Sequence, residues 1–301
     1  MRRWSLLIVL GLLASLWSAA ETVKFSWVKI RRHKNQHSRL LVDRDGDLKF
    51  DDAGGKLTFK SDSGDDDLAI GYDDITKVVF EKTSHMRGGA IAYVGLPGLI
   101  ASSVPVTDYW FYLEYKSGEH NEPVLFAIPG KGSSEKVIAR ARDLFRSRVT
   151  TPEFDEKGED IDPTTLLDLK SKRASKADKN NHPLPEVKAD KATVVVVCPA
   201  LENWYAGRGN QFKLHANDQV IAVNREGTYS IAYLDPGKYK LVSQSENANG
   251  FEMQLEAGKE YYFLQNTFQG ALRWHTELSR NSSELVMYEL NGAYYSDWKQ
   301  K

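Results

Sequence analysis

Short apolar or alternating stretches, separated by clusters of Asp and Gly, fill the first half of the chain. Short stretches in which apolar and polar residues alternate, bounded by turn residues, are typical of antiparallel strands. It predicts strands at residues 48–50, 57–60, 68–72, 75–82, 109–115 and 123–128. Apolar residues then recur at helical spacing between residues 133 and 149, with arginines mostly on the opposite side. The first half is therefore expected to be a strand meander on which one amphipathic helix lies.

The second half opens with a continuous β-branched run at residues 192–198, which is typical of a buried strand. Further strands are expected at residues 211–217, 219–224, 228–234, 238–246, 251–258, 260–268, 272–279 and 283–290. Strands at this spacing indicate an all-β sandwich. Pro236 and Gly237 predict a type II turn, with a positive φ at the glycine.

Composition changes mark the boundaries between segments. Residues 150–191 have few large apolar side chains and mixed charge, which predicts a linker with at most a short helix near 164–172. The expected organisation is a signal peptide at 1–20, a basic lead-in at 21–39, a first domain at 40–149, the linker at 150–191, a second domain at 192–290 and a tail at 291–301, to which no role is assigned.

Two stretches of the chain resemble known families. The segments LKFDDAGGKLTF, LAIGYDDITKVVFEK and YWFYLEY, followed by the helix, resemble bacterial pleckstrin-homology-like domains, which implies a small curved barrel plugged by one helix. The segments LDPGKYKL and LEAGKEYYF resemble exported bacterial domains of unknown function, related to transthyretin-like and carboxypeptidase-regulatory-like sandwiches. The second resemblance implies a fold and an exported location, and it brings no activity with it.

The first twenty residues favour export. Arg2 and Arg3 precede the apolar run 6–17, and small residues follow, so a signal peptide cleaved before Glu21 is expected. The run has about twelve residues, fewer than the roughly twenty that span a bilayer. The protein is therefore expected in the periplasm, the outer envelope or outside the cell. The lead-in 21–39 is interpreted as solvated, with contact to lipid headgroups or a polyanion as the alternative.

Charge and cysteine content limit the possible partners. The chain has 40 Lys and Arg against 41 Asp and Glu, so it has no overall field that would recruit nucleic acid. The single cysteine, Cys198, cannot form an internal disulfide and is expected to be buried in a strand rather than to act as a nucleophile.

The acidic stretch VDRDGDLKFDDAGG has the look of a calcium loop. With Asp43 at position 1, however, Leu48 stands where an EF-hand needs Gly, and Gly54 stands where it needs Glu. We therefore expect no dedicated metal site. Three turns, DRDG, DDAGG and SDSGDDD, are expected instead, with an acidic rim over residues 43–74 that is open to weak calcium binding.

Two segments are candidate contact surfaces. The apolar loop 88–106 either folds back over its own barrel or meets a lipid or a partner, through Ile91, Val94, Leu96, Leu99 and Ile100. In the loop 202–211, Trp204 and Tyr205 beside Arg208 form a possible contact surface for sugar or protein.

No catalytic motif stands out, and neither a catalytic nor a cofactor-binding residue is assigned. The sequence favours a non-enzymatic binding or scaffolding protein of the envelope whose partner is an unknown envelope protein or a glycan. One alternative is peripheral membrane association through the loop 88–106. The other is a hydrolase whose site is assembled in space from distant residues.

Overall fold

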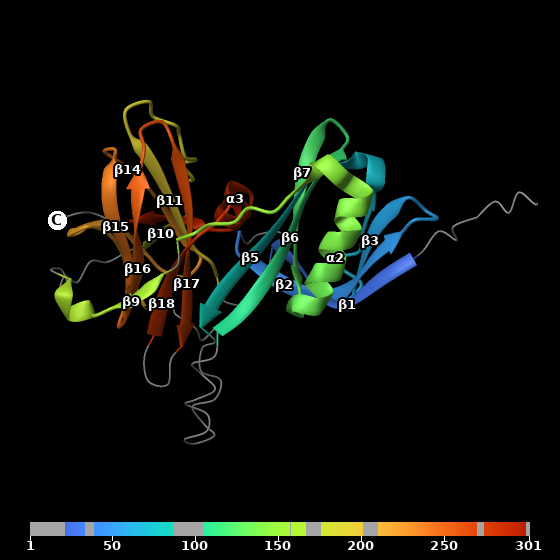
Figure 1. Ribbon diagram of the computed structural model, residues 1–301, viewed down its shortest axis with the longest axis horizontal. Coiled ribbons are helices and arrows are strands. Elements are labelled where there is room, and N and C mark those ends of the chain that lie inside the picture. Colours follow the sequence, from blue (N-terminus) through green and yellow to red (C-terminus); the bar gives the residue numbers. More distant parts are fainter. Residues whose placement is uncertain are drawn as a thin grey trace, which may run out of the picture.

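The computed structural model describes residues 22–33, 39–86, 105–156, 158–166, 176–200, 210–269 and 274–298. The chain is mainly β and forms three sheets, arranged in two units that lie side by side (Figure 1). No helix in these described ranges is long and apolar enough to cross a membrane.

The first unit is a sheet with the strand order β4-β3-β2-β1-β7-β6-β5-β8. Its strands are β1 (Thr22–His33), β2 (Leu41–Asp51), β3 (Lys56–Ser61), β4 (Leu68–Gly71), β5 (Ile75–Met86), β6 (Pro105–Ser117), β7 (His120–Ile128) and β8 (Val149–Thr150). All six strands predicted for this region are confirmed. The predicted helix is also confirmed as α2 (Gly130–Phe145), which lies over one face of the sheet (Figure 1).

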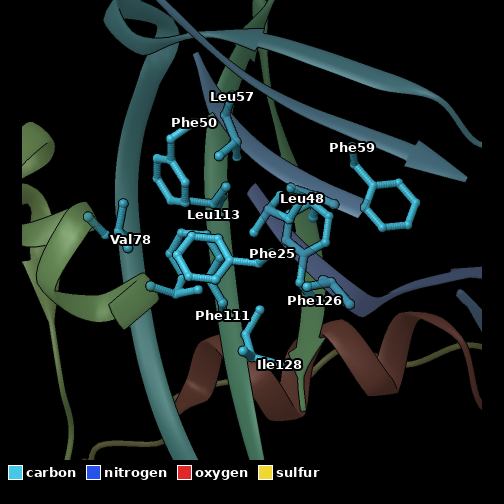
Figure 2. Packing of buried hydrophobic residues seen from close by; sticks show 14 of the residues in the cluster. Phe25, Leu48, Phe50, Leu57, Phe59, Val78, Phe111, Leu113, Phe126 and Ile128 are labelled. Carbon is cyan, nitrogen blue, oxygen red and sulfur yellow. The ribbon is translucent and has the colours of Figure 1, made fainter. Parts of the chain in front are cut away.

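The core of the first unit is aromatic. Phe50, Phe111 and Phe126 come from three different strands and gather inside the curved sheet together with Leu48 and other aliphatic side chains (Figure 2). Their ring centroids lie 6.5 Å (Phe50 to Phe111) and 6.1 Å (Phe111 to Phe126) apart. Because side chains alternate along a strand, every second residue contributes to this interior. Each fully buried side chain of this size contributes roughly 1.5–3 kcal/mol.

The expected lead-in is a strand. Residues 22–33 form β1, which lies between β2 and β7 and buries Val28 and Ile30 completely. The interpretation of this segment as solvated is therefore wrong. Its many basic residues hid an inward-facing apolar set, and a bulge near Trp27 breaks the simple alternation that sequence reading depends on.

The first predicted acidic turn is also wrong, because residues 43–46 lie within β2. Gly46 is opposite Val28 of β1, and a Cβ at this glycine would collide with the carbonyl oxygen of Lys60 and the ring of Phe59. The other two acidic turns are confirmed, with positive φ angles of 58° at Gly55 and 77° at Gly64.

The second unit is a sandwich of two sheets. One sheet has the order β13-β12-β15-β16-β9 and the other has the order β10-β19-β14-β11-β17-β18. The first sheet contains β9 (Glu159–Ile161), β12 (Phe212–Ala216), β13 (Gln219–Asn224), β15 (Gly237–Gln244) and β16 (Ala248–Leu255). The second contains β10 (Lys176–Asp178), β11 (Ala192–Cys198), β14 (Thr228–Leu234), β17 (Glu260–Gln269), β18 (Trp274–Arg280) and β19 (Tyr294–Asp297).

Two further expectations for the second half are corrected. Residues 283–290, predicted as a strand, belong to the helix α3 (Ser283–Asn291). Ser282 caps this helix by accepting a hydrogen bond from the Leu285 N–H, and its buried residues recur one turn apart. Gly237 has no positive φ, so the predicted type II turn is not formed.

Short strands occur in the described parts of the predicted linker and of the tail. β8 pairs with β5 of the first unit, whereas β9 pairs with β16 of the sandwich. β10 pairs with β19, which is formed by the tail residues Tyr294–Asp297. These short pairings need partners from distant parts of the sequence, so local composition could not reveal them.

Candidate functional site: the junction between the two β units

The two units meet at α3, the dark red helix between them in Figure 1. Leu285, Val286 and Leu290 of this helix are buried in an apolar cluster that also contains Tyr112 and Leu125 of the first unit. Strands β11, β14 and β17 of the sandwich supply the cluster's other side. The sheet face of the first unit that is opposite its aromatic core is therefore packed against the second unit.

Glu81 of β5 is the first charged component of the junction and is only 3% exposed. Its carboxylate accepts hydrogen bonds from the Asn281 side chain at 2.9 Å, from the Ser282 N–H at 3.1 Å and from the Ser282 hydroxyl. Burial raises the pKa of Glu81, and these hydrogen bonds partly oppose that rise. The residue thus attaches the first unit to the N-terminus of α3.

Arg31 of β1 is the second component. Its Nη1 donates to Asp43 of β2 at 2.8 Å, and its Nη2 donates to Glu289 of α3 at 3.2 Å. The guanidinium lies 5.9 Å from the ring centroid of Trp110, and the Tyr288 hydroxyl donates to the Arg31 carbonyl at 2.7 Å. Burial lowers the pKa of Arg31, but the two carboxylates outweigh burial, so the pKa is raised and the residue stays charged.

Lys77 and Glu284 form a third, more exposed link. Lys77 Nζ donates to Glu284 Oε1 at 2.8 Å and lies 3.9 Å from Glu114. Burial would raise the pKa of Glu284, but the hydrogen bond from Lys77 reverses the effect and the pKa is lowered. Because both side chains remain partly solvated, this pair contributes less to stability than Arg31 does.

An open cleft of about 380 Å³ lies beside this link. Its lining consists of Val79, Thr150, Thr151, Pro152, Phe154, Ser282, Ser283 and Glu284. The lining combines hydroxyl groups and one carboxylate with the apolar side chains of Val79, Pro152 and Phe154. No histidine is among these lining residues, and Ser283 Oγ donates to Glu284 Oε2 at 3.0 Å. Such a lining suits hydrogen bonding to a small polar group.

A second polar cluster crosses the interior of the sandwich. Ser230 donates to Asn224 at 2.7 Å, and Asn224 donates to Gln265 at 3.2 Å. Gln265 then donates to Ser243 at 2.7 Å, and the Ser243 and Thr276 hydroxyls lie 2.6 Å apart. All five residues are buried, and they come from both sheets. This cluster fixes how the sheets face each other, because every member is bonded within it.

Two other titratable groups lie at one end of the sandwich. Burial raises the pKa of the Cys198 thiol well above its usual range, which keeps it protonated and a poor nucleophile. Burial also raises the pKa of Glu226 to about 7, although Thr267 donates to its carboxylate at 3.5 Å. Among the residues described, no group of three or more His, Cys, Asp or Glu side chains is placed to hold a metal ion.

The contact residues predicted from the sequence lie outside the described residues. This holds for Trp204, Tyr205 and Arg208, and for Ile91, Val94, Leu96, Leu99 and Ile100. The junction residues Arg31, Glu81 and Glu289 were not predicted from the sequence. Glu81 gave no distinct signal, since it directly follows the apolar run Val78–Phe80 and precedes Lys82, where the strand becomes polar.

No protein-family model matches this chain, and no curated protein matches it.

Proposed function

We propose that this chain is an exported, non-enzymatic protein of the cell envelope that binds or scaffolds other envelope components. The observation that carries the proposal is the junction, which holds two β units in one fixed arrangement through a buried apolar cluster and the Arg31 and Glu81 links. A fixed pair of units can present two surfaces to partners at a constant distance.

The contacts of the buried charged residues favour a binding function over catalysis. Arg31, Glu81 and Glu289 are each occupied by hydrogen bonds or ion pairs between the units. Catalytic groups differ from these in facing a space where a substrate can reach them. At the cleft, Glu284 is likewise occupied by Lys77.

Export and the finer fold assignments belong to the same proposal. Export rests on the pattern of Arg2, Arg3 and the apolar run 6–17. The pleckstrin-homology-like assignment of the first unit is supported by its curved strand meander and single covering helix. The transthyretin-like assignment of the second unit is supported by its two-sheet architecture.

Affinity capture from envelope extract tests this proposal. The tagged chain 21–301 should retain a discrete envelope component, and a variant with an opened junction, Leu285→Asp with Val286→Asp, should retain less of it. A fusion of residues 1–20 to a reporter that is active only after export should be active. Retention of nothing above a tag-only control, or an inactive fusion, would remove the proposal.

Peripheral membrane association is the second candidate. Residues 105 and 106 of the predicted loop belong to β6, and Met86 of β5 pairs with Pro105, so the described residues that flank 87–104 lie next to each other. Sedimentation with liposomes should be lost when Leu96, Leu99 and Ile100 are changed to Asp. Absence of binding by the unmodified protein would end this candidate.

A further inference from the structure

Trp27 of β1 has an unusual position for a large apolar residue. Its side chain is 76% exposed, more than that of any other large hydrophobic residue in the described part of the chain. Its φ is +63°, a left-handed conformation that bulky side chains rarely adopt. Such conformations persist only where the surrounding structure enforces them, and they concentrate at functional sites.

A β-bulge enforces this conformation. Phe25 pairs with Leu48 and Val28 pairs with Gly46, so two residues, Ser26 and Trp27, stand opposite one residue of β2. With simple alternation, Trp27 would point to the same side as the buried Phe25. The extra residue instead keeps Phe25 and Val28 inside and leaves Trp27 outside.

The β2 side of the bulge depends on a glycine. Gly46 approaches the Lys60 carbonyl and the Phe59 ring so closely that no side chain fits there. The acidic stretch that looked like a calcium loop therefore supplies a close contact between β2 and β3 beside the bulge.

The surroundings of Trp27 are polar and carry both charges. Lys24 Nζ lies 2.7 Å from Asp47, and Ser26 also hydrogen-bonds to Asp47. On β2, Lys49 stands opposite Lys24 and the exposed Asp45 stands opposite Lys29. The strand positions around Trp27 thus carry three lysines and two aspartates, which together supply hydrogen-bond donors and acceptors and charges of both signs.

We propose that Trp27 is a stacking platform for a sugar ring of a neutral polysaccharide. The indole face covers the apolar C–H side of the ring, and Lys24, Ser26 and Asp47 are placed to bond its hydroxyl groups, which both donate and accept. The inference rests on the proposed binding function and names the chemical class of one ligand.

Two other occupants fit the same surface less well. Pairing of β1 with β7 ends at Lys29, which leaves residues 22–28 with a sheet edge, but the bulge and Lys24 are features that hinder the addition of a strand. A negatively charged surface would be repelled by the carboxylates of Asp45 and Asp47 beside the tryptophan.

Sedimentation with insoluble polysaccharide tests the proposal. The probes are microcrystalline cellulose and chitin, both neutral, with anionic phosphatidylglycerol vesicles as the comparison. The chain 21–301 should bind at least one neutral probe. Trp27→Ala should reduce binding about tenfold, as expected for loss of a central aromatic contact, whereas Trp27→Phe should retain most of it. Leu184→Ala, which truncates another exposed apolar residue, is the matched control and should bind normally.

The outcomes separate this inference from the function on which it rests. No binding to either neutral probe, equal binding by Trp27→Ala, or binding to the anionic vesicles alone would overturn the role of Trp27. Affinity capture of an envelope protein would still succeed in that case, and the proposed function would stand. Unchanged circular dichroism and melting temperature establish that each variant is folded.

Discussion

Replacing Arg31 by Met should destabilise the protein strongly. Arg31 is buried between Asp43 and Glu289, and Glu289 is itself buried. Removing the cation leaves the Glu289 carboxylate with its desolvation cost and without its ion pair, and breaking a buried pair in this way costs about 3–5 kcal/mol. Because Asp43 is partly solvated, most of that cost should come from Glu289. Urea unfolding at pH 7 measures the change in the free energy of unfolding.

A second substitution shows whether the reasoning is right. The double variant Arg31→Met with Glu289→Met removes both charges, and it should recover most of the lost stability, because apolar replacement of a buried pair is often close to neutral. The deficit of the single variant should also shrink as the pH is lowered, because burial raises the pKa of Glu289 and the unpaired carboxyl takes up a proton. A loss below about 1 kcal/mol, or a double variant no more stable than the single one, would refute the account of the junction.

Three further predictions concern other positions. The raised pKa of Glu226, about 7, means that the folded state holds this proton more tightly than the unfolded state. The contribution of Glu226 to stability is therefore complete below about pH 4.5 and is lost as the pH rises through 7. In urea unfolding, Glu226→Gln should have the same free energy of unfolding as the wild type at pH 4. At pH 8 its free energy of unfolding should be about 1–2 kcal/mol higher, a figure that allows for the partial exposure of the side chain. Ser282→Ala removes a helix cap and a partner of Glu81, and should cost about 1–2 kcal/mol in the same assay, whereas Ser283→Ala should be nearly neutral; equal effects would contradict the assigned cap. Trp27→Gly removes the strain of a left-handed backbone at a bulky residue and should raise the free energy of unfolding by about 1 kcal/mol. A loss of stability would show instead that packing of the Trp27 side chain stabilises the fold.

Local patterns predicted the elements of this protein better than their connections. The core strands and α2 follow from alternation and helical spacing, and the structure confirms them within a few residues, except that β2 begins at Leu41 instead of Leu48. β1 was missed because its bulge breaks the alternation and its inward residues are interleaved with lysines and arginines. α3 was predicted as a strand because its apolar residues are close together in a short segment, where helix and strand patterns are hard to separate.

The junction could not have been predicted from the sequence by such rules. Arg31 and Glu289 are 258 positions apart, and Glu81 and Ser282 are 201 positions apart. A charged residue in a strand is usually exposed to solvent. Arg31 and Glu81 are buried because the second unit packs against the strands that carry them. The bulge at Trp27 likewise depends on register between two strands, which composition does not specify.

The central claim is that the two β units form one rigid body, and a distance distribution between spin labels tests it most directly. Labels at positions 136 on α2 and 238 on β15 lie on different units at exposed sites, and the buried native Cys198 would not react. We expect a single narrow distance distribution, which should broaden in the Leu285→Asp, Val286→Asp variant. A broad distribution in the unmodified protein, as expected for two units on a flexible tether, would contradict it.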